Sequence, residues 1–299
     1  MRTKQAHRRP SVARIVDGVR VLPGFRAYPT LYVGSAVKAR HYRRDLASVK
    51  AFLLFVGHPR SGHSLVGSLL DAHPAMVVSH ELDVLKFVGL GYRRDQLLTL
   101  VLEHARANAE AGRKSWGYSY AVPGQWQGHW QRLEVMGDKR GRMTTDRLAA
   151  RPELLDDLAR TLRVPVKVVQ VVRNPYDNVA TMHARGSAPL AEQVARYREL
   201  CETVDRIAAG LTGDGFHRLY HEDLVAGTPA ALAALCGFLG VAAPDDYLAA
   251  CDGVVFPSPR RTRDGAPWTP EARAALDALV AETGWLGRYD FEGERGGGA

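Results

Sequence analysis

The sequence predicts an α/β protein with three layers, in which a central parallel sheet is flanked by helices on both faces. Short apolar runs alternate along the chain with longer segments that have a helical period. The run VKVVQVV (166–172) is rich in β-branched residues and shows no regular polar alternation. That composition is typical of a strand that is buried on both faces of a parallel sheet.

Five segments are expected to be strands, because each is a short apolar run that ends at a polar or glycine-containing turn. They are AFLLFVG (51–57), MVVSHE (76–81), LEVMGDK (133–139), VKVVQVVRNP (166–175) and FHRLYHEDL (216–224). Five segments between or after them have the apolar spacing of helices. They are LVGSLLDAH (65–73), DQLLTLVLEHARANAE (95–110), ELLDDLARTL (153–162), PLAEQVARYRELCETVDRIAAG (189–210) and PAALAALCGFLG (229–240).

The alternating pattern is continuous, so we expect a single domain over residues 51–290. Residues 1–50 are rich in Arg and Lys and have no clean period, which predicts a basic extension packed on or flanking that domain. Residues 291–299 include GERGGGA, a composition typical of a flexible tail. The sequence leaves the oligomeric state open.

The charge balance favours an anionic partner without identifying it. The 299 residues include 40 Lys and Arg against 32 Asp and Glu, a formal net charge of +8. Nucleic acid, an acidic membrane and a polyanionic small molecule all match that sign, and so does a surface that only keeps the protein dissolved. The sequence has no helix-turn-helix, zinc-finger or RNA-binding signature, so we expect no nucleic-acid partner.

Cysteine usage and hydropathy indicate the compartment. Cys201, Cys236 and Cys251 have neither CxxC nor Cys/His spacing, which argues against a disulfide framework and against zinc. The apolar runs are too short to span a bilayer, and the N-terminus lacks the apolar stretch of a secretory signal. We therefore expect a cytoplasmic protein with no transmembrane segment and no bound metal.

The stretch GHPRSGHS (57–64) has the glycine spacing of a loop that binds phosphate between a strand and a helix. Nucleotide-hydrolysing enzymes place a lysine where this chain has His63, followed by a hydroxyl residue, here Ser64. A neutral imidazole is a poor partner for a phosphate, so the fixed positive charge inside the loop is that of Arg60.

GHPRSGHSLVGSLLDAHP (57–74) resembles the 5′-phosphosulfate loop of sulfotransferases that use 3′-phosphoadenosine-5′-phosphosulfate (PAPS), especially the tyrosylprotein sulfotransferases and their bacterial relatives. The resemblance implies a P-loop-like fold, PAPS as co-substrate, 3′,5′-adenosine bisphosphate as product and no metal. It also implies cofactor contacts from Arg60, Ser61, Gly62, His63, Ser64 and Leu65. His63 departs from the threonine usual in the family, which puts one hydroxyl contact in doubt.

A second segment, VKVVQVVRNPYDNVATMHAR, independently suggests a phosphate site. Arg173 is expected to end a buried strand, Asn174 to cap the next helix, and Pro175 to occupy its first turn. Arg173 and Thr181 resemble the family's 3′-phosphate motif, an arginine followed by Ser or Thr at this separation. LYHEDLVAGTPAALAALCGFLGV resembles a further family segment, in which we expect mostly structural roles.

The stretch SPRRTRDGAPW lies near the C-terminus, where members of the family that the sequence resembles have a basic loop that closes over the 3′-phosphate. Arg261 and Arg263 are therefore candidates, and exposed solubilising charge is the alternative interpretation.

Sulfuryl transfer to a hydroxyl needs a base, a cation at the bridging oxygen and in-line positioning. By resemblance Glu81 is the expected base, with His80 and Asp83 as alternatives and helix capping as the other role for Glu81. Arg60 is expected at the bridging oxygen. Lys139 ends another strand on the same sheet edge and is expected near the transferred group, oriented by Asp138 or paired with it.

Residues 116–130, WGYSYAVPGQWQGHW, follow neither helical nor strand periodicity and are expected to form a loop. Their aromatic side chains suggest the wall of an acceptor pocket, for which the candidates are Trp116, Tyr118 and Trp126, with His80 beside them. A packed surface loop is the alternative. The acceptor is a hydroxyl compound whose identity (small molecule, glycan, lipid-linked glycan or peptide tyrosine) stays open.

Two other functions compete with sulfuryl transfer. A small-molecule or nucleoside kinase of similar fold needs a lysine at position 63 and magnesium ligands, and His63 argues against it. A non-catalytic nucleotide- or anion-binding protein accounts for the charge but not for the placement of Glu81.

Overall fold

A five-stranded sheet forms the centre of the computed structural model, which describes residues 26–115 and 118–295. The strands lie in the order β2-β5-β1-β6-β7, and all neighbouring pairs are parallel. Their bounds are β1 Ala51–Val56, β2 Met76–His80, β5 Val135–Lys139, β6 Val166–Val172 and β7 Phe216–Tyr220. The predicted α/β class and all five predicted strands are thereby confirmed.

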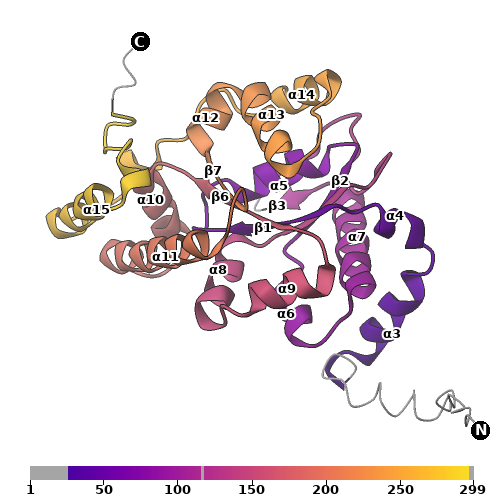
Figure 1. The fold of residues 1–299 in the computed structure, drawn as a ribbon. Coiled ribbons are helices and arrows are strands. Elements are labelled where there is room, and N and C mark those ends of the chain that lie inside the picture. The colour runs from indigo at the N-terminus through magenta and orange to yellow at the C-terminus, as the bar shows by residue number, and fades with distance from the viewer. Residues whose placement is uncertain (1–25, 116–117, 296–299) are drawn as a thin grey trace, which may run out of the picture.

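Helices cover both faces of the sheet (Figure 1). On one face lie α5 (His63–Asp71), α12 (His221–Ala226), α13 (Thr228–Leu239) and α14 (Asp245–Asp252). On the other lie α6 (Val84–Gly89), α7 (Arg94–Glu110), α8 (Gly141–Ala150) and α9 (Leu154–Leu162). The three-layer prediction is confirmed by this arrangement.

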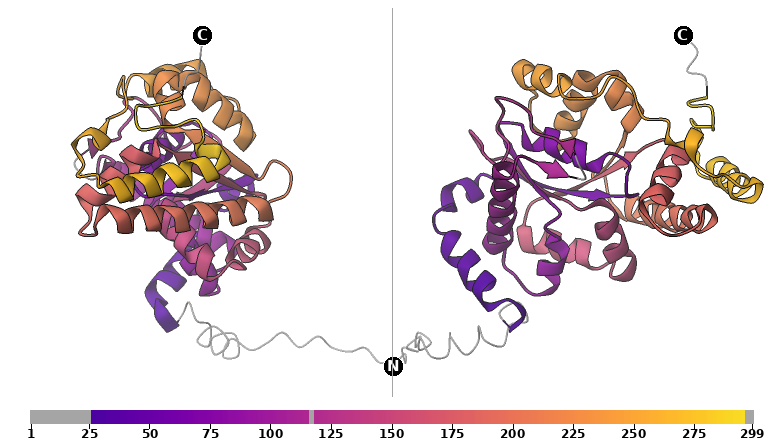
Figure 2. Two further views of the ribbon diagram at one scale, coloured as in Figure 1. Left: turned by 90° about the vertical axis from the view of Figure 1, so that its left-hand side faces the viewer. Right: turned by 180° about the vertical axis from the view of Figure 1, so that it is seen from behind.

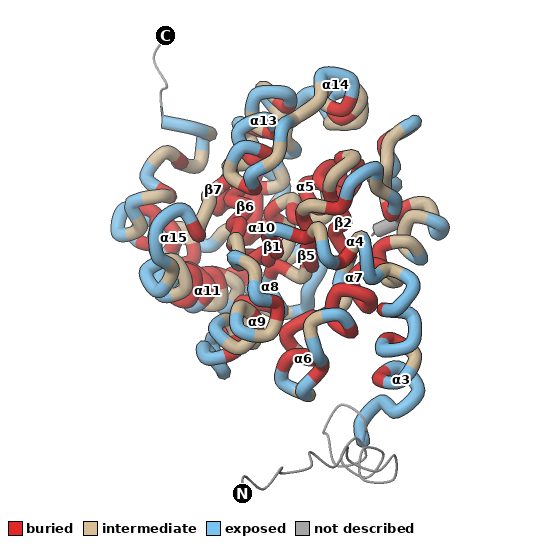
Figure 3. Tube along the Cα trace, turned by 45° about the vertical axis from the view of Figure 1, so that its right-hand side comes forward, coloured by how far each residue is buried: buried red, intermediate tan, exposed pale blue. Residues whose placement is uncertain are grey.

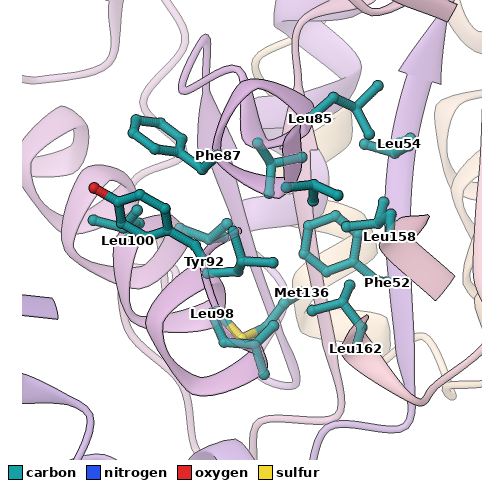
Figure 4. Packing of buried hydrophobic residues seen from close by; sticks show 14 of the residues in the cluster. Phe52, Leu54, Leu85, Phe87, Tyr92, Leu98, Leu100, Met136, Leu158 and Leu162 are labelled. Atoms are coloured by element: carbon teal, nitrogen blue, oxygen red, sulfur yellow. The ribbon is translucent and has the colours of Figure 1, made fainter. Parts of the chain in front are cut away.

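Successive residues of β1 point to opposite faces of the sheet, as the pleat of a strand requires. Phe52 and Leu54 pack in a cluster with residues of α6, α7 and α9, which Figure 4 shows from close by. Leu53 and Phe55 pack in the other cluster, with residues of α5, α13 and α14. Every residue of β1 is therefore buried, and the strands form the buried centre of the chain in Figure 3.

The remaining elements extend this core at its two sides. The long helices α10 (Pro175–Arg185), α11 (Leu190–Gly210) and α15 (Pro270–Glu282) share a third apolar cluster. At the other side, α3 (Pro29–Lys38) and α4 (Arg43–Ala47) pack on α7 (Figure 2, indigo). The short elements are β3 Lys114–Ser115, β4 Tyr118–Ser119, η1 Thr262–Gly265 and η2 Gly284–Leu286.

Cys201, Cys236 and Cys251 are buried and unpaired, as expected of core thiols. Over residues 26–115 and 118–295, no helix has the length and apolar character needed to cross a bilayer.

A buried ion pair joins the end of α5 to the segments around it. The Asp71 carboxylate accepts hydrogen bonds from the Arg113 guanidinium, from the Val78 N–H at 2.7 Å and from the Gly128 N–H at 2.7 Å. Both charged side chains are almost fully buried, with exposed fractions of 4% for Arg113 and 0% for Asp71. Asp71 thus ties α5 to β2 and to the segment that precedes β5.

We expect Asp71→Ala to lower the free energy of unfolding by about 3–5 kcal/mol, because it leaves the buried Arg113 charge without its partner. Denaturant unfolding measures this loss. The control is Arg160→Ala, which breaks an ion pair with Asp157 whose arginine is 74% exposed and should cost less than about 1 kcal/mol. Similar losses for the two variants would show that the Asp71 pair has no special structural weight.

Candidate active site

The loop of residues 57–64 leaves β1 at the carboxyl edge of the sheet and runs directly into α5. Gly57 and Gly62 have φ angles of 115° and 106°, a region that glycine tolerates and side chains do not. Gly62 is the N-cap residue, so the N–H groups of the first turn of α5 have no partner within the helix. Free N–H donors and the positive end of a helix dipole are the features by which a helix N-terminus can bind an anion.

Lys139 links this loop to Glu81. Its Nζ donates to Glu81 Oε1 at 2.6 Å and to Ser64 Oγ at 3.1 Å. The lysine is buried, whereas the Glu81 side chain is 50% exposed. Burial acts to raise the pKa of Glu81, but the Lys139 ammonium holds it below its ordinary value, so the carboxylate is ionised at neutral pH.

Arg60 lies within electrostatic range of Glu81 and Tyr120, and also of Arg185 at the end of α10. Burial, together with the positive charge of Arg185, lowers the pKa of Arg60, while Glu81 and Tyr120 oppose this shift. Arg60 and Lys139 therefore supply the positive charge that position 63 does not.

A tight turn after β2 sets the position of Glu81. The residues Glu81 and Asp83 both have left-handed φ angles, 71° and 69°. The buried Asp138 carboxylate holds this turn, because it accepts from the N–H groups of Leu82 at 3.1 Å and Val84 at 2.9 Å.

Two sequence-based alternatives are corrected by this turn. Asp138 does not hydrogen-bond Lys139 but fixes the backbone that carries the expected base. Asp83, the alternative base, is buried and forms an ion pair with Arg147 of α8, so its carboxylate serves packing.

The ring of His63 turns back under the loop rather than out toward an anion. Its Nε2 lies 2.9 Å from the Val56 carbonyl oxygen, and the ring packs edge-on against Phe55. Gly141 makes room for it, since a Cβ there would lie 2.5 Å from His63 Nδ1. The expected contact of this residue with the cofactor is thereby restricted to its backbone.

Arg173 and Thr181 meet as their spacing predicts. Arg173 follows β6, Asn174 caps α10 by accepting from two N–H groups, and Pro175 opens the helix. Arg173 Nη1 lies 3.4 Å from Thr181 Oγ1. The Arg173 Nε is buried and has no hydrogen-bond partner among the described residues. The Nε atoms of four other described arginines share this state, so it is the placement of Arg173 beside Thr181, at the carboxyl end of β6, that favours an anion there.

The basic segment near the C-terminus folds onto α10, although not through the arginines that the sequence singled out. Arg261 is exposed and pairs with Asp264, and the buried Arg263 pairs with Asp177. The residues that reach the phosphate motif are Arg260, whose carbonyl oxygen accepts from Arg173, and Thr262, whose Oγ1 lies 2.9 Å from Thr181 Oγ1.

The aromatic residues of the 116–130 segment are divided between two places. Trp116 lies outside the described residues. The rings of Tyr118 and Tyr120 stack with their centres 6.1 Å apart. The Arg260 guanidinium lies 5.5 Å from the centre of the Tyr118 ring. Trp126 instead donates its backbone N–H to Ala72, at the far end of α5 from the loop, so the structure does not bring it to the site.

His80 and Tyr120 border a small cavity of about 10 Å³ that Ser64 also lines. Burial and the charge of Lys139 lower the pKa of His80 to about 4, so its imidazole is neutral at pH 7. Within the described ranges there is no group of three or more His, Cys, Asp or Glu side chains placed to hold a metal ion.

Arg185, Arg260 and Thr262 were not predicted from the sequence, and Tyr120 belongs to the predicted aromatic segment but was not among the residues selected from it. Arg260 and Thr262 belong to the basic stretch SPRRTRDGAPW that the sequence did indicate. The wrong residues of that stretch, Arg261 and Arg263, were selected as phosphate contacts. Arg185 ends the helix that carries Thr181, one turn further on, and that spacing is a usable signal.

The buried His63 should make stability pH-dependent. Burial and the charge of Lys139 lower the pKa of His63 to about 4, below its ordinary value of 6.5, so protonation favours the unfolded chain. Its contribution is complete above pH 6.5 and is lost as the pH falls toward 4. We expect His63→Gln to reduce the loss of unfolding free energy between pH 7 and pH 4 by about 3 kcal/mol, measured by denaturant unfolding at each pH.

The matched control for this prediction is His129→Gln, which removes an exposed histidine. If the two variants decline with pH in parallel with the unmodified protein, the ring of His63 is hydrated in the folded state and its buried placement is wrong.

Solved sulfotransferase structures are similar to this chain in fold. The chain resembles the sulfotransferase domain of the Synechococcus PCC 7002 olefin synthase, at 20% identity and a TM-score of 0.51 over 81% of this chain and 96% of that one. It also aligns with sulfotransferase STF9 from Mycobacterium avium, at 13% identity and a TM-score of 0.48, over 94% of this chain and 86% of STF9. Mouse sulfotransferase SULT7A1 complexed with PAP aligns at 13% identity and a TM-score of 0.46, over 82% of this chain and 92% of the mouse chain.

A search of curated proteins gives no match. The family described as the sulfotransferase family matches residues 53–245, which is more than half of the chain. The protein is therefore a member of the sulfotransferase family, and its chemistry is the transfer of a sulfuryl group.

Proposed function

We propose that this sulfotransferase moves the sulfuryl group of PAPS to a hydroxyl group, with Glu81 as the general base. One observation carries the proposal. The ionised Glu81 carboxylate is held 2.6 Å from Lys139 Nζ, and the same Nζ bonds Ser64 in the first turn of the anion-binding helix. A base and an anion site thus share one buried cation.

The residues present fit the two phosphate ends of PAPS. The first turn of α5, Arg60 and the Ser64 hydroxyl would hold the phosphosulfate. Arg173, with its unpartnered Nε, and Thr181 would hold the 3′-phosphate. The basic segment contributes Thr262 and Arg260 to this second end, whereas the guanidinium groups of Arg261 and Arg263 are bonded to other protein groups.

PAPS supplies a sulfuryl group attached to a phosphate leaving group. Glu81 accepts the proton of the acceptor hydroxyl as its oxygen forms the new bond to sulfur. The sulfur–phosphate oxygen bond breaks, and its electron pair remains on the phosphate oxygen. Arg60 and Lys139 stabilise that developing negative charge, and the Lys139 charge is least compensated when Glu81 has become neutral.

Two features of the site favour this chemistry over the alternatives. A kinase would need a lysine at position 63. This chain has a histidine there, and the His63 ring is turned into the interior. A protein that only binds anions has no use for an ionised carboxylate beside its anion site. The cytoplasmic location expected from the cysteines remains a prediction, as does the absence of a nucleic-acid partner.

Adenosine bisphosphate should raise the melting temperature more than AMP does, because a ligand that binds only the folded state stabilises it and Arg173 recognises the extra 3′-phosphate. Arg173→Ala should abolish the difference between the two nucleotides. Thermal unfolding with each nucleotide at equal concentration measures it.

The control is Arg261→Ala, because Arg261 is exposed and paired with Asp264 and should leave the difference intact. Loss of the difference in Arg261→Ala but not in Arg173→Ala would move the 3′-phosphate site to the basic segment.

Glu81→Gln keeps the shape of the side chain and removes the proton acceptor. We expect kcat to fall by roughly 10²–10⁴, the usual contribution of general-base catalysis, while the affinity for adenosine bisphosphate stays within a factor of about two. The measurement is transfer of ³⁵S from labelled PAPS to an acceptor found by screening hydroxyl compounds, with nucleotide affinity determined by calorimetry on the same preparation.

The companion variant is His80→Asn, which tests the alternative base. Near-normal kcat in Glu81→Gln together with a large loss in His80→Asn would assign the base to His80.

A further inference from the structure

An open pocket of about 530 Å³ lies beside the loop, and the proposed mechanism does not use it. Its wall comes from Pro59 and Arg60, from the end of α10 with the residues that follow, from α8 through Arg142 and from the first half of α11. The volume is that of a small-molecule site. None of the residues assigned to the 3′-phosphate lines this pocket, and it meets the proposed reaction centre only at Arg60.

Four arginines and two glutamates line the pocket, an excess of positive charge. The arginines are Arg60, Arg142, Arg185 and Arg196, and the glutamates are Glu192 and Glu199. Arg142 and Arg196 share the carboxylate of Asp146, at 3.2 Å and 2.7 Å, so their positions are fixed by protein groups.

Arg185 differs from these two. Its side chain makes no ion pair or hydrogen bond with any residue in the described part of the chain, and it lies close enough to Arg60 to lower the pKa of that guanidinium. Two like charges that face one pocket repel each other unless an anion lies between them. Arg185 lines this pocket, whereas Arg173 and Thr181 do not, so we assign that anion to the pocket rather than to the 3′-phosphate.

We propose that the pocket binds the acceptor, and that the acceptor is a hydroxyl compound that also carries an anionic group, such as a carboxylate or a sulfate. Arg185 binds the anionic group, and Arg196 and Arg142 stand behind it. The acceptor hydroxyl then lies toward Arg60, within range of Glu81. The inference rests on the proposed function, because it assigns the pocket to the second substrate of that reaction.

The test compares two matched pairs of compounds that differ in one anionic group. The pairs are p-nitrophenyl β-D-glucuronide with the glucoside, and 4-hydroxyphenylacetate with 4-hydroxyphenethyl alcohol. Calorimetry at low salt, on protein with and without adenosine bisphosphate, should show that the acid of at least one pair binds about tenfold or more tightly than its neutral partner. Arg185→Ala should remove this preference, and Arg185→Lys should retain part of it.

Arg198→Ala is the matched control, because Arg198 belongs to the same helix α11 but pairs with Glu282 and does not line the pocket. It should leave the preference unchanged.

Three results would overturn the inference: no preference for the acid in either pair, a preference that survives Arg185→Ala, or a weaker affinity of Arg185→Ala for adenosine bisphosphate. Failure of the unmodified protein to bind adenosine bisphosphate would instead contradict the proposed donor, and the comparison without nucleotide would still decide the pocket.

Discussion

The backbone pairing of β2 with β5 is the constraint on which the site depends. In this register His80 lies opposite Lys139, and the pairing continues one step further, where the Glu81 N–H donates to the Lys139 carbonyl at 2.9 Å. A slip of one residue would turn the lysine to the other face of the sheet. The contact of Lys139 with Glu81 and Ser64 is thus a product of sheet register rather than of flexible side chains meeting at a surface.

That register is itself held by apolar burial. β5 is buried along its length and is flanked by β1 and β2, so a slip of one residue would exchange the faces of its apolar side chains. The charged residues at the carboxyl edge are the exception, and each has a partner from another element. The Asp138 carboxylate is one such case, since it is fully enclosed and accepts from a hydroxyl and two N–H groups.

The sequence was sufficient where a structural feature depends on neighbours in the chain. β-branched runs predicted the strands, and the eight-residue separation of Arg173 and Thr181 predicted that they would meet, because a strand end and the following helix fix that geometry locally. It was insufficient where the partner is distant. The inward turn of His63 depends on Gly141, and the engagement of Arg263 depends on Asp177, and neither partner is marked by any local pattern. The arginine pocket is of the same kind, since it needs three helices to be placed first.

Three charged residues of the site have backbone angles that suit glycine or asparagine better. Arg60, Glu81 and Asp83 have φ angles near 70°, and each such residue costs roughly 1 kcal/mol or more relative to a relaxed backbone. Glycine at position 81 would remove this strain, but it would also leave the buried Lys139 ammonium without its carboxylate partner. Losing the partner of a buried charge costs more than the strain it relieves. The ion pair thus holds Glu81 in a backbone conformation that it would not otherwise adopt, and stability and the proposed chemistry select for the same residue at this position.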